Sequence, residues 1–530
     1  HAGTSISAAV GMATALKDCD PKRYVVAVIG DGAMTCGMGF EALNHAGELG
    51  LNNLIVILND NEMSISPNVG AISWFFSRSI TAHTPTRARS KFKSLYHRGY
   101  IPEVVYKAID RVEEVTQGAI SGASMLFEAF GFRYIGPVDG HNIDDLLKAL
   151  TNAKRQDVPV LVHARTIKGK GYQPAEINPV AWHGVSPFKR ESGQFQVKAV
   201  PPGRKSPLSY TEVFSRSLLK LARHNSKIVA ITAAMPTGTG LDRFQKEFPD
   251  RFYDVGICED HAVTFAAGLA CEGYRPVCAI YSSFLQRGYD QILHDVCIQK
   301  LPVVFALDRS GVVGEDGETH QGVFDVAYLR SLPNMTIMAP SNEIDLQNML
   351  YTAFLQNGPV AIRYPRGASS GLGLARKFYK LKIGEAEIVK NGADLLFICL
   401  GPMVNHALAA AKRLKCDLGI SSTIINARFA KPLDQALLLQ QIPRHSLVCT
   451  IEDHTLAGGF GSGVLEMAND HGLVLQQPIF RFGVGDQFVP HATQAQQHCS
   501  QKYDPESIYQ FVAEKLASRK LAAVPLGRTG

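Results

Sequence analysis

The sequence lacks the features that direct a protein to nucleic acids or membranes. No long block of Lys or Arg occurs in its 530 residues, and the formal net charge is only +6. A nucleic-acid partner is therefore not indicated, and small anionic substrates fit this charge balance equally well. No apolar run approaches the length of a membrane span, and no signal peptide is visible. We expect neither a nucleic-acid partner nor a membrane partner.

Paired cysteines are also lacking. The ten cysteines are scattered singly between Cys19 and Cys499, and no Cys-x-x-Cys pair occurs. This pattern is typical of reduced, buried residues in an intracellular protein, and not of zinc ligands or disulfides. We therefore expect a cytoplasmic protein.

A starting methionine is missing as well. The chain begins at His1, in a loop that leads directly into an apolar helix. We expect an upstream segment to be absent from this sequence. Any targeting sequence would be absent with it, so a plastid location would require a transit peptide that has been lost upstream.

What is present is a long, hydrophobic chain with an α/β pattern. Hydrophobic residues make up 46% of the chain, enough for several packed domains. Strand-like and helix-like segments alternate almost throughout, which predicts three successive α/β domains with mostly parallel sheets. We place the domains at residues 1–172, 209–370 and 383–525, and the Pro-rich residues 173–208 form a linker.

Within these regions we expect particular elements. The first region should contain a long loop over Ser64–Tyr100 and a helix over Pro102–Gln117. Strands are expected later in the chain at Ile228–Ala233, Tyr253–Ile257, Pro276–Ile280, Pro302–Leu307, Val360–Tyr364, Leu395–Leu400, Ser422–Ile425 and Leu447–Ile451.

Two polar turns follow two apolar strands near the start of the chain. Gly-Asp31-Gly follows the run Tyr24–Ile29, and Asn-Asp-Asn61 follows the run Leu54–Leu58. In an open α/β sheet both turns lie at the edge where ligands bind. A carboxylate and an amide oxygen, with a backbone carbonyl and two phosphate oxygens, suit Mg²⁺. The helix starting near Gly37 offers its N-terminus to a diphosphate. The alternative is two ordinary strand-to-helix turns, but the combined spacing resembles the thiamine-diphosphate signature.

Glu259 is the second candidate. It lies between the strand expected at Tyr253–Ile257 and an apolar helix, where a carboxylate can simply be stabilised by the helix N-terminus, by about 0.3–1 kcal/mol. Thiamine chemistry, however, needs a carboxylic acid beside the aminopyrimidine ring. The acid shifts the ring toward its imino tautomer, and the imino group then takes the proton from thiazolium C2. Phe284 could stack on the same ring, and ordinary core packing is the equal alternative.

Several longer motifs carry a close resemblance that runs through essentially the whole chain. They are Val28-Ile-Gly-Asp-Gly-Ala, Ile57-Leu-Asn-Asp-Asn-Glu-Met-Ser-Ile-Ser, Tyr134-Ile-Gly-Pro-Val-Asp-Gly-His, Lys168-Gly-Lys-Gly-Tyr172, Glu259-Asp-His-Ala-Val-Thr-Phe-Ala-Ala-Gly, Phe284-Leu-Gln-Arg-Gly-Tyr-Asp-Gln, Gly314-Glu-Asp-Gly-Glu-Thr-His-Gln-Gly and Ile362-Arg-Tyr-Pro-Arg-Gly. The chain resembles the 1-deoxy-D-xylulose-5-phosphate synthase family of transketolase-like thiamine-diphosphate enzymes. The last three motifs favour this family over transketolase itself.

The resemblance implies roles for individual residues. Asp31, Asn61 and the carbonyl of Met63 would bind Mg²⁺. The thiamine diphosphate would contact a set made up of His1, Gly32, Ala33, Asn61, Tyr172, Glu259 and Phe284. The substrate channel would be lined by His183, Tyr281, Arg287, Asp316, His320 and Arg366. Among these, Glu259, His183 and His320 would be catalytic, and the two arginines would bind phosphate.

The activity implied by the resemblance is the decarboxylation of pyruvate on thiamine diphosphate. The two-carbon unit is then added to D-glyceraldehyde 3-phosphate, giving 1-deoxy-D-xylulose 5-phosphate and CO₂, a precursor of isoprenoids, thiamine and pyridoxal. The resemblance also implies a homodimer with each site between the first and second domains of one chain. The alternatives are transketolase and a catalytically incomplete cofactor-binding fragment.

Some of these residues have simpler interpretations. Arg287 and Arg366 could form surface or interdomain ion pairs, His183 in a Pro-rich linker could be incidental, and His320 could be a loop hydrogen-bonding residue. Cys258 and Asp260 replace the Ala and Gln usual beside the catalytic Glu, and Asp260 adds negative charge there.

A glycine-rich run in the third region also looks phosphate-binding. It reads Gly458-Gly-Phe-Gly-Ser-Gly463. Its spacing is not the dinucleotide fingerprint, and we expect the start of a closely packed helix here.

Overall fold

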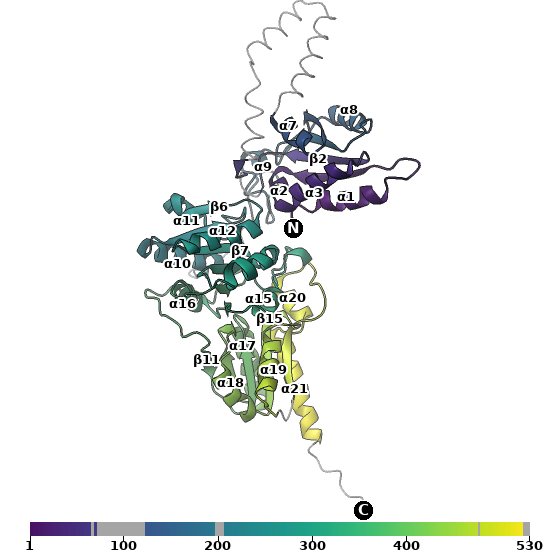
Figure 1. Ribbon diagram of the computed structural model, residues 1–530. Coiled ribbons are helices and arrows are strands. Elements are labelled where there is room, and N and C mark those ends of the chain that lie inside the picture. The colour runs from purple at the N-terminus through teal and green to yellow at the C-terminus, as the bar shows by residue number, and fades with distance from the viewer. Residues whose placement is uncertain (65–67, 72–121, 197–205, 475–477, 523–530) are drawn as a thin grey trace, which may run out of the picture. The chain divides into compact units, whose positions relative to one another are not determined.

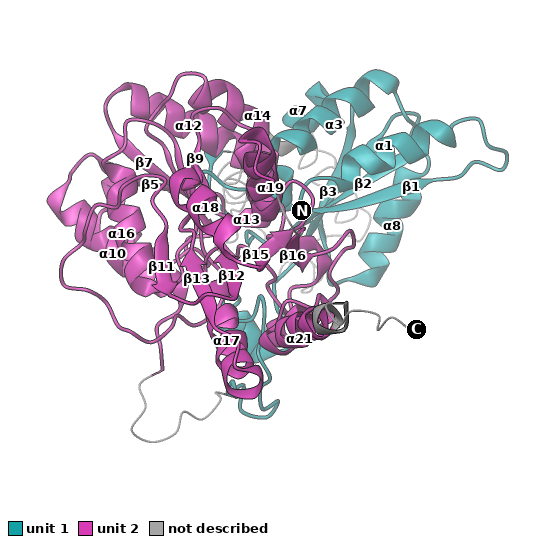
Figure 2. Ribbon diagram, turned by 90° about the horizontal axis from the view of Figure 1, so that it is seen from below, with its two compact units in different colours: residues 1–199, 254–258 teal, residues 200–253, 259–530 magenta. Residues whose placement is uncertain are grey.

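The chain forms two compact units, which we describe separately from a computed structural model. One unit contains residues 1–199 and 254–258, and the other contains residues 200–253 and 259–530 (Figure 2). The structure describes residues 1–64, 68–71, 122–196, 206–474 and 478–522. The helix expected over Pro102–Gln117 and most of the loop expected over Ser64–Tyr100 lie outside these residues.

The first unit is built on a four-stranded parallel sheet in the order β1-β2-β4-β3. Figure 1 shows this unit in purple to blue, with its strands drawn as arrows. Its strands are β1 (Val25–Gly30), β2 (Leu54–Asp60), β3 (Arg133–Asp139) and β4 (Val160–Arg165). The described helices of this region are α1 (Ser5–Ala15), α2 (Asp31–Met34), α3 (Gly37–Leu49), α7 (Gly122–Ala129), α8 (Ile143–Ala153) and α9 (Gln173–Ile177).

Strand β2 is buried on both faces, as the central position of a parallel sheet requires. Leu54, Val56 and Leu58 pack in the core cluster that also contains residues of α1 and α3. Ile55 packs instead with Ala149 of α8, in a second cluster. The continuous apolar run in the sequence thus reflects burial from both sides.

The register between β1 and β2 decides where the two polar turns lie. Gly30 is paired with Asn59 across the parallel strands, so the residues that follow each strand emerge at the same edge. The prediction that the two turns share one sheet edge is confirmed.

Residues 173–196, expected to belong to a linker, carry a short helix and a cluster of aromatic rings. Trp182 contacts Tyr172, Phe188 and Phe195, with ring centroids 5.0, 4.6 and 5.0 Å away. Phe188 and Phe195 also form an isolated antiparallel bridge. The domain boundaries themselves stay predictions.

The second unit begins with a seven-stranded sheet in the order β14-β9-β10-β8-β7-β5-β6. The strands are β5 (Ile228–Thr232), β6 (Phe252–Asp254), β7 (Arg275–Tyr281), β8 (Val304–Asp308), β9 (Thr336–Met338), β10 (Val360–Arg363) and β14 (Phe429–Lys431). The principal helices are α10 (Tyr210–His224), α12 (Glu259–Cys271), α15 (Asp325–Arg330) and α16 (Glu343–Phe354), and shorter ones are α11 (Asp242–Glu247), α13 (Ser282–Leu285) and α14 (Tyr289–Gln291). Helices α10 and α16 pack together over the main core cluster of this sheet.

The strand expected over Tyr253–Ile257 is shorter than predicted. Strand β6 ends at Asp254, whose carboxylate accepts a hydrogen bond from the backbone N–H of Gly256 at 3.0 Å. Gly256 has a φ of 76°, which continues a turn and not a strand. A local side-chain-to-backbone hydrogen bond therefore overrides the apolar pattern.

A third sheet has five strands in the order β11-β13-β12-β15-β16. Its strands are β11 (Glu387–Lys390), β12 (Leu395–Cys399), β13 (Ser422–Asn426), β15 (Leu447–Thr455) and β16 (Ile479–Val484). The helices of this region are α17 (Met403–Leu418), α18 (Gln435–Gln441), α19 (Phe460–Asp470), α20 (Gln494–Ser500) and α21 (Pro505–Ala522). All its pairs are parallel except that of β11 with β13, so the predicted α/β class with mostly parallel sheets is confirmed.

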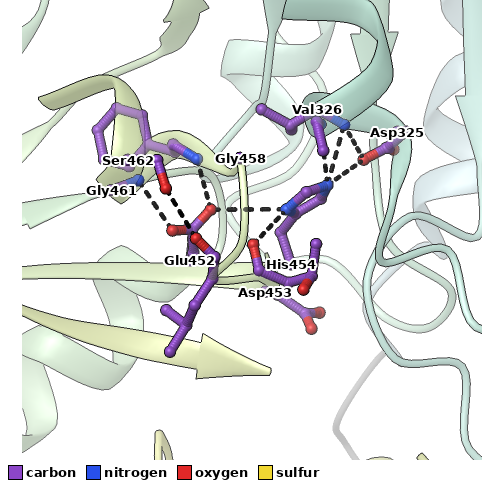
Figure 3. Close-up of polar contacts among 12 residues, drawn as sticks. Asp325, Val326, Glu452, Asp453, His454, Gly458, Gly461 and Ser462 are labelled. Carbon is purple, nitrogen blue, oxygen red and sulfur yellow. Dashed lines mark hydrogen bonds and ion pairs between the residues drawn. The ribbon is translucent and has the colours of Figure 1, made fainter. Parts of the chain in front are cut away.

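The end of β15 joins this sheet to two helix N-termini (Figure 3). The Glu452 carboxylate accepts hydrogen bonds from the backbone N–H groups of Phe460 (2.6 Å) and Gly461 (2.8 Å) at the start of α19. A Cβ on Gly459 would lie 2.4 Å from Glu452 Oε2, so the glycine permits this approach. The glycine-rich run is therefore a closely packed helix start, and its amides bind this carboxylate and not a phosphate.

His454, two residues further, is held as a neutral ring. Its Nε2 accepts hydrogen bonds from the backbone N–H groups of Val326 (3.1 Å) and Ala327 (3.3 Å). Its Nδ1 donates to the Thr455 carbonyl at 2.8 Å. Burial lowers the pKa of His454 to about 4. A protonated ring would lose its acceptor role at the start of α15.

This geometry predicts a pH dependence of stability. Below the ordinary His pKa of 6.5, this histidine is protonated in the unfolded chain, whereas in the folded chain it stays neutral down to about pH 4. The free energy of unfolding therefore decreases as the pH falls. We expect His454 to account for a loss of about 2 kcal/mol between pH 7 and pH 5. Urea midpoints of the wild-type chain and His454→Gln at both pH values would measure it. An equal loss in both proteins would contradict the assignment.

Candidate functional site

The carboxyl-terminal edge of the first sheet gathers the predicted metal ligands. Asp31 starts α2 directly after β1 and is 4% exposed. Its Oδ2 accepts a hydrogen bond from Asn68 Nδ2 at 2.7 Å. Its Oδ1 is buried and accepts no hydrogen bond from the described part of the chain. A buried carboxylate oxygen without a donor is suited to a cation.

A second buried carboxylate faces this one. Burial, followed by the neighbouring Asp60 carboxylate, raises the pKa of Asp31 to about 7. Burial acts the same way on Asp60, but its hydrogen bond and ion pair with His163 hold the pKa of Asp60 below its ordinary value. A divalent cation at Asp31 would relieve the repulsion between the two carboxylates.

Asp60 belongs to a buried hydrogen-bonded chain that sequence reasoning missed. His163 Nε2 lies 2.8 Å from Asp60 Oδ2, and its Nδ1 lies 2.7 Å from the Tyr134 hydroxyl. The sequence carries a weak signal for His163, a polar residue between the apolar Val162 and Ala164 of β4. Its partner is 103 residues away, so no local pattern identifies it.

The turn after β2 is held by its own side chains. Asn61 Oδ1 accepts the Met63 N–H at 3.0 Å, and Asp60 Oδ1 accepts the Glu62 N–H at 3.2 Å. Glu62 has a φ of 62°, in the left-handed region. The Asn61 oxygen keeps a second lone pair for a ligand. Within the described residues no group of three His, Cys, Asp or Glu side chains could hold a metal, so a metal here would depend on amide and carbonyl oxygens.

At the same edge of the sheet, two segments of backbone lie so close to neighbouring residues that only glycine fits. A Cβ on Gly32 would lie 2.8 Å from both Ser64 Cβ and Asn68 Oδ1. A Cβ on Gly3 would lie 1.9 Å from Cys36 Sγ and 3.6 Å from the Ala33 carbonyl oxygen. The first residues of the chain therefore lie against the turn that contains Gly32 and Ala33, and the exposed His1 lies two residues before Gly3.

Lys168 connects the predicted His183 to this edge. Its ammonium donates to the Ser64 carbonyl and to His183 Nδ1, the latter at 3.0 Å. Burial lowers the pKa of Lys168, and the Asp31 charge opposes this shift. Burial and the Lys168 charge lower the pKa of His183. Sequence reasoning quoted the motif with Lys168 but assigned a role only to Tyr172.

Tyr172 contacts the aromatic cluster around Trp182. Its hydroxyl donates to the Arg190 carbonyl at 2.9 Å, and its ring contacts Trp182 and Phe188 in the aromatic cluster. None of its contacts in the described residues is with Asp31 or Asn61. Its assignment to the cofactor stays a prediction.

In the second unit, Glu259 is the first residue of α12 and is 3% exposed. Burial raises its pKa; the Arg287 charge opposes this shift and the Asp260 charge reinforces it. Arg287 Nη1 lies 3.7 Å from Glu259 Oε2. The raised pKa makes the carboxyl group easier to protonate than an exposed glutamate, and a protonated carboxyl can donate a hydrogen bond to a ring nitrogen.

Phe284 contacts two other rings near the end of β7. Phe284 is half-buried and lies parallel to Tyr281, with centroids 5.6 Å apart, and it meets the edge of His320 at 5.3 Å. Burial raises the pKa of Tyr281 to about 12. Phe284 does not belong to the core clusters of the described residues, so this arrangement favours a stacking role over core packing.

Arg309, which sequence reasoning missed, is a further candidate because it contacts the predicted Tyr281. Its guanidinium lies 3.9 Å from the centroid of the Tyr281 ring and donates to the Gly238 carbonyl at 2.9 Å. A Cβ on Gly238 would lie 2.1 Å from the Tyr281 hydroxyl oxygen. Arg309 has a φ of 61°, a left-handed conformation that is uncommon for a non-glycine residue. This backbone feature is visible in the structure but not in the sequence.

Arg366 is bound to the loop that carries Asp316. Its Nη1 donates to the Val313 carbonyl and to Asp316 Oδ2, both at 2.9 Å. Its Nη2 lies 4.0 Å from Glu315 Oε2. Arg366 therefore pairs within this loop, whereas Arg287 pairs with Glu259, so the two predicted phosphate ligands belong to different groups of contacts.

None of the helices in the described residues is both long and apolar enough to cross a membrane.

Family models of known proteins match three stretches of the chain. Residues 1–166 match the family model described as 1-deoxy-D-xylulose-5-phosphate synthase. Residues 206–370 match the transketolase pyrimidine binding domain, and residues 384–508 match the transketolase C-terminal domain.

The curated relatives are similar over nearly the whole chain. It is 51% identical to 1-deoxy-D-xylulose-5-phosphate synthase 1 of Geobacter sulfurreducens, over 99% of this chain and 81% of that protein. It is 50% identical to 1-deoxy-D-xylulose-5-phosphate synthase of Thermomicrobium roseum, over 98% of this chain and 79% of that protein.

Solved structures confirm the transketolase-like fold. A split-gene transketolase, solved as an inactive β4 tetramer, has a TM-score of 0.52 at 28% identity and covers 59% of this chain and 99% of its own. The transketolase from Campylobacter jejuni has a TM-score of 0.50 at 17% identity and covers 97% of this chain and 82% of its own.

Proposed function

This chain belongs to the 1-deoxy-D-xylulose-5-phosphate synthase family, and on that premise we propose that it condenses pyruvate with D-glyceraldehyde 3-phosphate. The products are 1-deoxy-D-xylulose 5-phosphate and CO₂. The observation that carries the proposal is the 51% identity to a named synthase over 99% of the chain. Transketolase is not favoured, since the full-length likeness to it is one of fold at 17% identity.

The residues of the first unit fit a magnesium diphosphate. Asp31, Asn61 and the Met63 carbonyl would bind Mg²⁺. Support comes from the buried Asp31 Oδ1, which lacks a donor among the described residues, and from the repulsion that Asp60 exerts on Asp31. Gly32 and Ala33 would lie at the diphosphate. The thiamine diphosphate supplies a carbon nucleophile and an electron sink when it is bound.

The residues of the second unit would act on protons and on ring orientation. Glu259, with its raised pKa, would hold a proton toward the aminopyrimidine ring. Phe284 would stack on that ring with its half-buried face. Lys168, whose ammonium binds His183, would orient that histidine.

The acceptor phosphate would be bound by guanidinium groups. Arg366 is half-buried and held between Val313 and Asp316, so its position is defined before a phosphate arrives. Arg287 is the second candidate, and His320 and Tyr281 would line the same part of the site. Support for one site comes from Tyr281, whose pKa responds to the charges of Asp316 and Arg366.

The direct test is product formation. The purified chain is incubated with pyruvate and glyceraldehyde 3-phosphate, and pyruvate-dependent CO₂ and 1-deoxy-D-xylulose 5-phosphate are measured. Transfer of two carbons from a ketose phosphate to ribose 5-phosphate, without CO₂, would indicate transketolase instead. We also propose a homodimer, which light scattering of the same sample tests.

Replacing Arg366 by Met should act mainly on the phosphorylated acceptor. A charge-assisted hydrogen bond contributes about 1.5–3 kcal/mol, so the KM for glyceraldehyde 3-phosphate should rise about 10- to 100-fold. The KM for pyruvate should change much less.

Arg287→Met should also disturb Glu259, because the two side chains lie 3.7 Å apart, so it should change both kcat and KM.

Unphosphorylated glyceraldehyde is the control substrate for Arg366. The variant should use it about as well as the wild-type chain does. Equal impairment with both acceptors would exclude phosphate recognition by Arg366.

A further inference from the structure

The loop that carries Asp316 and His320 is held by side chains that come almost two hundred residues later. Gln497, on α20, is 1% exposed. Its Oε1 accepts the Gly314 N–H at 2.8 Å, and its Nε2 donates to the Gly314 carbonyl at 3.1 Å and to the Pro490 carbonyl at 2.8 Å. The amide thus binds both backbone groups of one loop residue, as a neighbouring strand would.

Gln494, one helical turn earlier, joins this loop to Arg366. Its Nε2 donates to the Val312 carbonyl at 2.8 Å and to the Arg366 carbonyl at 3.2 Å. Arg366 in turn donates to the Val313 carbonyl. The backbone of the loop and the backbone of the proposed phosphate ligand are therefore fixed by the same amide group.

The helix that carries both glutamines is itself well defined. Thr493 and Gln496 form a capping box at its N-terminus. A Cβ on Gly314, whose φ is 81°, would lie 3.4 Å from the Ala492 carbonyl oxygen and the Gln494 nitrogen. The start of α20 thus contacts the loop closely.

The neighbouring loop residues are also anchored by the third-sheet region. Asp453 Oδ1 accepts the Val312 N–H at 3.0 Å and the Tyr503 hydroxyl at 2.8 Å. Gln321 Oε1 accepts the Val313 N–H at 2.7 Å, and its Nε2 donates to the Val489 carbonyl at 3.3 Å. Figure 3 shows where Asp453 lies, at the end of β15 beside His454.

We propose that Gln494 and Gln497 are positioning residues for the acceptor-phosphate subsite, acting through the backbone of residues 312–314 and of Arg366. This inference rests on the proposed function. Neither glutamine is assigned a contact with substrate. Their amides fix the carbonyl of Val313 and the direction in which the chain approaches Asp316, and these two residues orient the Arg366 guanidinium.

The matched control lies at the C-terminal end of the same helix. Gln501, the C-cap residue of α20, also binds backbone and side-chain groups, through Oε1 to the Gly485 N–H (3.3 Å) and Gln487 Nε2 (3.0 Å). None of its hydrogen bonds in the described residues reaches the loop at 312–321. Gln501→Leu therefore removes a similar amide without touching the proposed subsite.

The kinetic test compares Gln494→Leu, Gln497→Leu and Gln501→Leu in the full chain. Loss of two hydrogen bonds at the subsite should raise the KM for glyceraldehyde 3-phosphate about 10-fold in the first two variants. The KM for pyruvate should change less than about 2-fold, and Gln501→Leu should match the wild-type chain. Gln494→Glu keeps the shape of the side chain but lacks the amide that donates both hydrogen bonds. Its KM for glyceraldehyde 3-phosphate should therefore be raised as in Gln494→Leu.

A second readout needs no substrate and no cofactor. Hydrogen exchange of a peptide covering residues 311–322 should be faster in Gln494→Leu and Gln497→Leu than in Gln501→Leu, while the rest of the second unit exchanges as before. A uniform rise in exchange, or an equal rise of KM for both substrates, would show a merely structural role and overturn the proposal.

Different results would overturn the proposed function and the positioning role of the two glutamines. A wild-type chain that makes no 1-deoxy-D-xylulose 5-phosphate overturns the proposed function. A wild-type chain that is active, with Gln494→Leu and Gln497→Leu indistinguishable from Gln501→Leu in KM and exchange, overturns the positioning role alone.

Discussion

Glu259→Gln is expected to bind thiamine diphosphate but to exchange its C2 proton about 100- to 10,000-fold more slowly than the wild-type chain, the range typical of a lost general acid–base group. Glutamine has the shape of the protonated carboxyl that burial favours at this position, so the fold should be retained. The amide cannot pass a proton on, which removes the relay and leaves the packing.

The measurement is hydrogen–deuterium exchange at thiazolium C2 under saturating cofactor. Asp260→Asn is the matched control, because Asp260 is the next residue of α12 but is exposed. It should exchange at nearly the wild-type rate. A wild-type rate in Glu259→Gln, or an equal loss in both variants, would remove Glu259 from the proton relay.

Asp31→Ala is expected to abolish magnesium-dependent binding of thiamine diphosphate. The side chain supplies the buried oxygen that lacks a donor in the described residues, and the remaining Asn61 and Met63 oxygens are neutral. The variant without ligands should be at least as stable as the wild-type chain, since the substitution removes a carboxylate that Asp60 repels.

Calorimetric titration with the cofactor, with and without Mg²⁺, measures the first effect, and urea unfolding of the ligand-free chain measures the second. Glu62→Gln is the control, because it changes a carboxylate in the same turn that is not a proposed ligand. Unchanged affinity in Asp31→Ala would exclude the metal site. Lower stability of the ligand-free variant would show that Asp31 is structural.

The predicted strands agree with the structure where apolar runs are continuous. The runs at Leu54–Leu58 and Leu447–Ile451 lie in strands covered on both faces, and burial from both sides demands such composition. The strands that were not predicted are β9, β11, β14 and β16. Strands β9, β11 and β14 have only three or four residues, and β16 includes the partly exposed Arg481.

One of these strands shows why local patterns were insufficient. Strand β14 follows β13 of the third sheet in sequence but pairs with β9 of the second sheet. Three residues are too few for a recognisable periodicity, and the partner strand lies about ninety residues earlier in the chain. No local pattern could therefore identify this strand. The shortened β6 is the opposite case, in which one local hydrogen bond at Asp254 ended a plausible strand.

The family, the mostly parallel α/β class and the common sheet edge of Asp31 and Asn61 could all be predicted from the amino-acid sequence. These features follow from local order, since strand-forming runs and the turns after them lie next to each other in the chain. Three other features became visible only in the folded chain: Asp60 opposes Asp31, Lys168 binds His183, and Gln494 and Gln497 hold the loop before Arg366. The last of these contacts joins residues 183 positions apart. Contacts between distant residues depend on how the sheets and helices pack, and burial then determines which charges and amides must face one another.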